Sequence, residues 1–120
     1  MTYFFDTYAI IEIIKNNENY TKFINEEIAT SILNIGELHY ALLRDYNKNI
    51  AEEWKNKLKE SIISFDVNII VRAMEFKFEN KRRNFSFIDC VGYILAKEND
   101  LIFLTGDKEF EKMENVEFVK

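Results

Sequence analysis

Short apolar runs alternate with longer amphipathic segments along this chain, and this alternation is the strongest constraint on its fold. The predicted strands are residues 3–5, 28–32, 63–67, 101–104 and 116–119. The predicted helices are residues 8–15, 20–26, 34–47, 50–62, 69–81, 86–97 and 108–113. The run 101–104 is continuously apolar, which is typical of a central parallel strand. Together these patterns predict an α/β fold: a three-layer sandwich whose central, mainly parallel sheet of about four to five strands is flanked by helices.

The composition is that of a globular protein with a substantial core. The chain has 120 residues, of which 48% are hydrophobic, and this suits one domain over residues 1–120. No run approaches the ~20 apolar residues of a membrane span, and the N-terminus has no secretory pattern. The single cysteine, Cys90, excludes an internal disulfide and fits a reducing compartment. We therefore expect a cytoplasmic protein without a membrane segment.

The formal net charge of the chain is -5. This charge argues against a protein that grips nucleic acid by bulk positive charge. It does not exclude an enzyme whose acidic site is neutralised by a bound metal ion. The positions of the acids therefore matter more than their number.

Four acids lie in apolar windows that contain no lysine or arginine: Asp6, Glu37, Asp89 and Asp107. The other acids mostly lie among lysines and asparagines, as on a solvated face. A carboxylate in apolar surroundings must be paired, protonated or bound to a metal ion, because an isolated buried charge is very costly. Oxygen ligands without His or Cys favour Mg²⁺ or Mn²⁺ over zinc.

Helix capping is a competing explanation for each acid taken singly. Asp6 and Asp107 directly precede predicted helices, and Asn34–Glu37 and Ser86–Asp89 have the spacing of a capping box. Each cap would stabilise its helix by ~1 kcal/mol. Capping and metal binding are compatible, since helices that follow parallel strands begin at the carboxyl edge of the sheet.

That edge is where ligands bind in open α/β folds. Asp6, Glu37 and Asp107 each follow a predicted strand, so we expect them there together. Asp89 has no strong strand before it and is not placed by this argument. Acids that gather at one edge raise each other's pKa unless a cation joins them. The sequence therefore predicts a metal site at this edge.

The ordered set of motifs resembles the PIN domain and, within that family, the VapC-type toxins of toxin–antitoxin pairs. An apolar strand leads into Asp6, Glu37 lies near a helix start, Asp89 closes Ser-Phe-Ile-Asp, and Asp107 closes Leu-Thr-Gly-Asp. These four residues match the acids of the family by position, and Asp6 and Asp89 match the pair most consistently bound to metal. The resemblance covers nearly the whole chain and implies a PIN-like sheet.

The resemblance also implies an activity, a cofactor and partners. It implies a metal-dependent endoribonuclease in which all four acids are catalytic and bind Mg²⁺ or Mn²⁺. Thr7 and Thr105 match auxiliary hydroxyl residues beside the first and fourth acids, whereas Tyr8 departs from the small residue common at its place. The implied partners are an RNA substrate, a cognate antitoxin protein and a second copy of the chain in a homodimer. Four basic residues could hold RNA, although a helix C-terminal charge run explains them more simply: Lys77, Lys81, Arg82 and Arg83.

Two other functional classes remain open from the sequence. A phosphoryl-transfer domain also places acids and Mg²⁺ at a sheet edge, but no second acid closely follows Asp6. A non-catalytic PIN-like binding module would keep the fold without turnover. The only histidine, His39, lies two residues past Glu37 and therefore points away from it on a helix, so no His-based nucleophile system is indicated.

Overall fold

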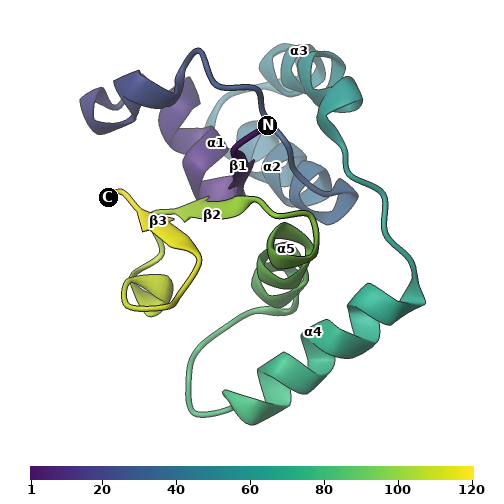
Figure 1. The fold of residues 1–120 in the computed structure, drawn as a ribbon. Coiled ribbons are helices and arrows are strands. Elements are labelled where there is room, and N and C mark those ends of the chain that lie inside the picture. The colour runs from purple at the N-terminus through teal and green to yellow at the C-terminus, as the bar shows by residue number, and fades with distance from the viewer.

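A parallel three-stranded sheet lies at the centre of the computed structural model, which describes residues 1–120 (Figure 1). The strands are β1 (Tyr3–Phe5), β2 (Ile102–Thr105) and β3 (Val116–Phe118). The order is β1-β2-β3, and both pairings are parallel, so β2 is central. This position confirms the prediction made from the continuously apolar run.

Five α-helices and three short 3-10 helices surround the sheet. The α-helices are α1 (Thr7–Ile14), α2 (Ile32–Asp45), α3 (Lys48–Leu58), α4 (Val67–Glu79) and α5 (Phe87–Glu98). The 3-10 helices are η1 (Glu18–Phe23), η2 (Lys59–Ser61) and η3 (Lys108–Phe110). The helix predicted at 20–26 is instead the 3-10 helix η1, which begins two residues earlier, and the helix predicted at 108–113 is shortened to the 3-10 helix η3. No helix combines the length and the apolar character that crossing a membrane would require.

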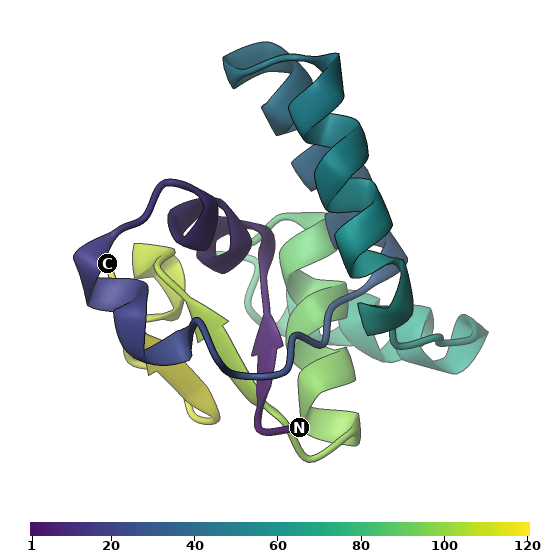
Figure 2. The same ribbon diagram turned by 90° about the horizontal axis from the view of Figure 1, so that it is seen from above.

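The strands send alternate side chains to two separate cores, as the pleat of a strand requires. Phe4 and Phe103 belong to a buried cluster with residues of α4 and α5. Phe5 and Leu104 belong to a second cluster with residues of α1, α2 and α3. The sheet therefore has helices on both faces, which confirms the predicted α/β layering. Figure 2 shows that the α2–α3 pair extends beyond the sheet.

The predicted strands at 28–32 and 63–67 are not formed, so the expectation of four to five strands is wrong for the regular sheet. The segment 28–32 forms only two isolated parallel bridges, one between Phe4 and Ala29 and one between Thr30 and Ile62, the residue just before the second predicted strand. The first segment stops pairing because Ser31 already caps α2. The two segments still extend the layer on the side of β1 away from β2, where Thr30 exchanges backbone hydrogen bonds with residues 61 and 63.

Gly92 allows α5 to lie close against the sheet. A Cβ atom at this position would lie 3.0 Å from a ring carbon of Phe4 and 3.2 Å from one of Phe103. Gly92 is therefore a packing residue and does not face the predicted acidic site. Cys90, on the same helix, is buried and free in the same cluster, as packing alone would require.

We predict that Phe103→Ala lowers the free energy of unfolding by about 3–5 kcal/mol, because Phe103 is fully buried and truncation leaves a cavity. Chemical denaturation followed by circular dichroism measures the change. Phe78→Ala is the matched control, since Phe78 is 69% exposed and its truncation should change stability by about 0.5 kcal/mol or less. Equal losses for the two variants would contradict this description of the core.

Candidate active site

Asp6 is the most buried of the four predicted acids, with only 4% of its surface exposed. It directly follows β1 and caps α1, where its Oδ1 accepts a hydrogen bond of 2.8 Å from the backbone N–H of Ala9. Its Oδ2 accepts a hydrogen bond from the Thr105 hydroxyl. The capping explanation for Asp6 is therefore confirmed, and the second bond adds a contact that no cap requires.

Thr105 connects Asp6 to Asp107 at the end of β2. Its Oγ1 donates to Asp6 and accepts a 3.0 Å hydrogen bond from the backbone N–H of Asp107. Asp107 in turn caps η3, because its Oδ1 accepts a 3.0 Å bond from the N–H of Glu109. A single buried hydroxyl thus fixes two acids that follow different strands.

Asp89 lies in the first turn of α5 and forms a complete capping box with Ser86. The N–H of Ser86 donates to Asp89 Oδ2 at 3.0 Å, and the N–H of Asp89 donates to the Ser86 hydroxyl at 3.0 Å. This box was predicted from the sequence. It engages one oxygen of Asp89, and no hydrogen bond engages the other.

Glu37 is not a capping residue, and the capping box predicted over Asn34–Glu37 is wrong. Helix α2 begins at Ile32 with Ser31 as its cap, so Glu37 lies in the second turn and is exposed. The cap is Ser31 because its hydroxyl accepts from the N–H of Asn34 at 3.2 Å and donates to the Asn34 side chain at 2.6 Å.

Asn34 has a role that the sequence analysis missed. It is 2% exposed, and its side-chain amide donates to the Thr7 hydroxyl at 3.0 Å. The start of α2 is thereby fastened to the residue that follows Asp6. The Ser-x-x-Asn spacing was a visible capping signal, but the predicted strand over 28–32 obscured it.

One open cavity of about 770 Å³ brings the four predicted acids together. Asp6, Glu37, Asp89 and Asp107 all line it, as does the auxiliary residue Thr7. The other lining residues come mainly from α1, α2 and the turn after β2: Tyr8, Ile11, Tyr40, Ala41, Arg44, Ser86, Gly106, Lys108 and Lys120. Thr105 lies beneath this surface, fully buried.

The acids in this cavity oppose one another's ionisation. Burial raises the pKa of Asp6 from 3.8 to about 8, against the hydrogen bonds from Thr105 and Ala9, and the charges of Asp89 and Asp107 raise it further. Burial also raises the pKa of Asp89, and Asp107 and Glu37 add to that increase. None of the four acids forms an ion pair: the six ion pairs of the chain all involve other carboxylates.

The chemistry of this donor set fits a hard divalent cation, because a cation would relieve the repulsion and replace the missing basic partners. The arrangement of these side chains does not by itself form a complete set of metal ligands. No three of the His, Cys, Asp and Glu side chains are arranged so that they could hold one ion together. Mg²⁺ usually keeps several waters and takes only one or two carboxylates directly. The residues present therefore fit a hydrated ion on Asp6 and a neighbouring acid.

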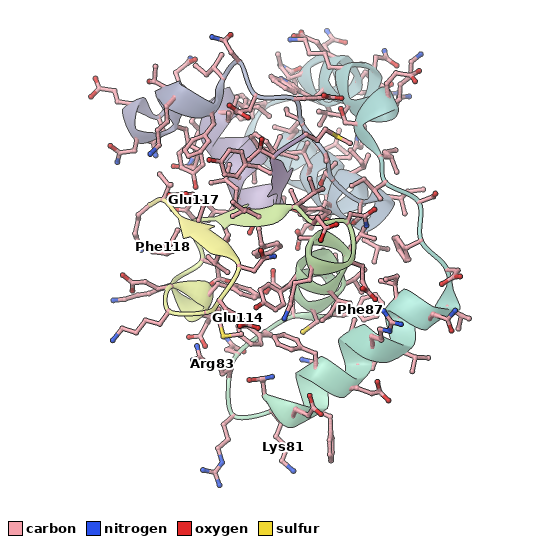
Figure 3. The ribbon with its side chains drawn as sticks, viewed as in Figure 1. Lys81, Arg83, Phe87, Glu114, Glu117 and Phe118 are labelled. Carbon is pink, nitrogen blue, oxygen red and sulfur yellow. The ribbon has the colours of Figure 1, made fainter.

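The basic residues considered for RNA binding do not line the cavity. Lys77 donates to the carbonyl of Phe85 at 2.5 Å, and Lys81 lies over the ring of Phe78. Arg83 donates to the carbonyl of Glu109 at 2.6 Å. Figure 3 shows Lys81 at the end of α4, pointing away from the sheet, and Arg83 on the loop that follows.

The cavity instead has a basic rim that the sequence analysis missed, made of Arg44, Lys108 and Lys120. Lys108 directly follows Asp107, so its proximity was visible in the sequence. Arg44 could have been found by helical spacing, since it lies seven residues, or two turns, after Glu37. No local signal places Lys120 beside α1.

Comparison with known proteins identifies the family. The PIN domain family profile matches residues 3–116, and the chain therefore belongs to the PIN domain family. No curated protein matches the chain. Among solved structures, VapC20 of Mycobacterium tuberculosis, described as a sarcin–ricin loop cleaving toxin, has a TM-score of 0.82 at 16% identity, over 99% of this chain and 100% of that one.

Two toxin–antitoxin structures are similar as well. VapBC2 from Rickettsia felis, bound to a promoter DNA fragment, has a TM-score of 0.74 at 20% identity, with full coverage of both chains. A toxin–antitoxin complex from Klebsiella pneumoniae has a TM-score of 0.78 at 17% identity, over 97% of this chain and 96% of that one. At these identities the likeness shows a shared fold.

We predict that the metal-free protein loses stability as the pH rises from about 4 to about 8. The folded state holds the Asp6 proton more tightly than the unfolded state, because the folded pKa of about 8 exceeds the ordinary 3.8. The stabilisation is therefore present at low pH and lost as the pH rises through the folded pKa. Thermal unfolding across this range, with a chelator present, measures the effect.

Asp6→Asn should flatten this pH dependence and should unfold at a higher temperature than the parent at pH values above about 8. Asp66→Asn is the control, because Asp66 is an exposed cap of α4, bonded to the N–H of Asn68. It should keep the pH dependence of the parent. Parallel curves for the parent and Asp6→Asn would contradict the burial of this carboxyl.

Proposed function

We propose that this protein is a metal-dependent endoribonuclease that hydrolyses RNA phosphodiester bonds, and that it is the toxin of a type II toxin–antitoxin pair. The observation that carries the proposal is the set of four carboxylates, Asp6, Glu37, Asp89 and Asp107, on one open cavity with no ion pair. Membership of the PIN domain family supports it, and so do structural neighbours that are described as toxins or toxin–antitoxin complexes.

The residues of the cavity have distinct roles in this proposal. Asp6 would hold the ion from a fixed position, because both of its oxygens are oriented by hydrogen bonds. Asp89 and Asp107 each have one oxygen engaged in a cap and one without a hydrogen bond, which would be available to the ion or to its waters. Glu37, which accepts no hydrogen bond, would orient a water molecule of the bound ion. When bound, Mg²⁺ or Mn²⁺ supplies an activated water and neutralises charge at the scissile phosphate.

We predict that Asp6→Asn and Asp89→Asn each lower the rate of RNA cleavage by about a hundredfold or more. Several kcal/mol of charge stabilisation depend on the metal, and about 1.4 kcal/mol corresponds to a factor of ten in rate. Cleavage of labelled RNA with Mg²⁺ or Mn²⁺, against a chelator, measures the loss. Asp66→Asn, which removes a carboxylate outside the cavity, should cut as fast as the parent.

Metal binding can be measured separately from cleavage, through its effect on the unfolding temperature. Mn²⁺ should raise the unfolding temperature of the parent but not that of Asp6→Asn, because a ligand that binds only the folded state stabilises it. Active-site variants that cut as well as the parent would show that a contaminating nuclease produces the cleavage. A parent that binds Mn²⁺ and cuts no RNA would favour a non-catalytic PIN-like module. The phosphoryl-transfer alternative has no support from the family match.

We also propose an antitoxin and a second copy of the chain as protein partners. The neighbours described as complexes of toxin with antitoxin support the first of these. Light scattering should give a mass of about twice 14.4 kDa for the purified chain if it forms the proposed homodimer.

We predict that the product of an adjacent small open reading frame copurifies with this chain and suppresses its RNA cleavage. Suppression is expected because an antitoxin segment bound over the acidic cavity would keep RNA from its carboxylates. Pull-down from cells that express both genes, followed by the cleavage assay on the complex, measures both effects. A complex that cuts RNA as fast as the free chain would contradict this arrangement.

A further inference from the structure

One wall of the acidic cavity is aromatic, and the proposed hydrolysis does not use it. Tyr40 lines the cavity and is 68% exposed. It lies on α2 three residues after Glu37, so the two side chains share a face of the helix. Ala41 lines the cavity next to it, and no aromatic or cation–π partner lies against the Tyr40 ring.

A second tyrosine, Tyr8, faces the same cavity from α1. Its position is fixed by the turn that carries Asp107, because a Cβ atom at Gly106 would overlap the Tyr8 ring. Ile11 continues this wall one turn further along α1. The cavity therefore has an apolar and aromatic side beside its carboxylates.

The basic rim supplies the complementary charge for a phosphate chain. Lys108 and Lys120 line the cavity and form no ion pair, whereas Arg44 shares its charge with Asp45 at 2.9 Å. Phosphates attract such side chains, and unpaired bases stack on exposed aromatic rings. Both features border the carboxylates within one cavity, which is the arrangement that a nucleotide beside a scissile phosphate would need.

We propose that the cavity takes an unpaired nucleotide of the RNA, with its base stacked on Tyr40 and bordered by Tyr8, while Lys108 and Lys120 contact the flanking phosphates. This proposal rests on the proposed nuclease function and assigns Tyr40 as the residue that positions one base of its substrate. The Tyr40 contact requires an unpaired base, since a base within a duplex has both faces covered by its neighbours and cannot reach the wall.

The test is the binding of a labelled oligouridylate, followed by fluorescence anisotropy with Ca²⁺ in place of Mg²⁺, with the integrity of the RNA checked on a gel. Tyr40→Ala should weaken binding by about five- to a hundredfold, the range for loss of one stacking contact. Tyr40→Phe keeps the ring and should keep the affinity. Tyr46→Ala is the matched control, because Tyr46 is 46% exposed at the end of the same helix but does not line the cavity.

An abasic oligomer of the same length and charge distinguishes the contribution of the bases to binding from that of the phosphate backbone. All four proteins should bind it equally, because it offers no ring to stack. If Tyr40→Ala binds oligouridylate as the parent does, or weakens binding of the abasic oligomer as much, the stacking site is wrong. A parent that binds neither oligomer also overturns it.

The assay does not depend on cleavage, so the two proposals can fail separately. A parent that binds oligouridylate through Tyr40 but cuts no RNA with Mg²⁺ or Mn²⁺ would retain the stacking site and overturn the nuclease. A parent that cuts RNA with no contribution from Tyr40 would retain the nuclease and overturn the stacking site. Because Tyr40 is exposed, its truncation leaves the core intact, and circular dichroism of the variant confirms folding.

Discussion

The parallel pairing of β1 with β2 is the interaction on which the rest of the structure depends. It sets Phe4 opposite Phe103 and Phe5 opposite Leu104, which divides the interior into its two cores. It also brings Asp6 beside the Thr105 hydroxyl, although the two residues are 99 positions apart in the chain. The pairing of β1 with β2 thus determines both the division of the core and the position of Asp6 in the site.

The acidic cavity lowers the stability of the folded protein, because it holds carboxylates together without basic partners. Asp6 is almost fully buried without a basic partner, and its raised pKa records the free-energy cost of ionising it there. Such local inconsistency in a protein that is otherwise well packed is typical of a functional site. A divalent cation would remove the conflict, and the proposed nuclease uses that same cation for its reaction. The tyrosine rings and lysines around the carboxylates are suited to the bases and phosphates of the proposed RNA substrate.

Much of the fold and part of the site could be predicted from local patterns. The continuously apolar run identified β2 as the central strand, and the alternation of strands with helices indicated the layered α/β fold. The cap at Asp6 and the box of Ser86 with Asp89 were also predictable, because they depend on residues at most three positions apart. The four acids stood out by their apolar neighbours, and all four do line one cavity.

The sequence by itself therefore determined which acids are set apart, which helix starts Asp6, Asp89 and Asp107 occupy, and the three runs that form the regular sheet, because propensity, capping and burial depend on near neighbours. Only the tertiary structure decided that residues 28–32 pair through isolated bridges at Ala29 and Thr30, and that Glu37 reaches the cavity from the second turn of α2. It alone placed Thr105 between two acids, and Tyr40 and Lys120 around them. These arrangements depend on the packing of distant segments, which no local pattern encodes.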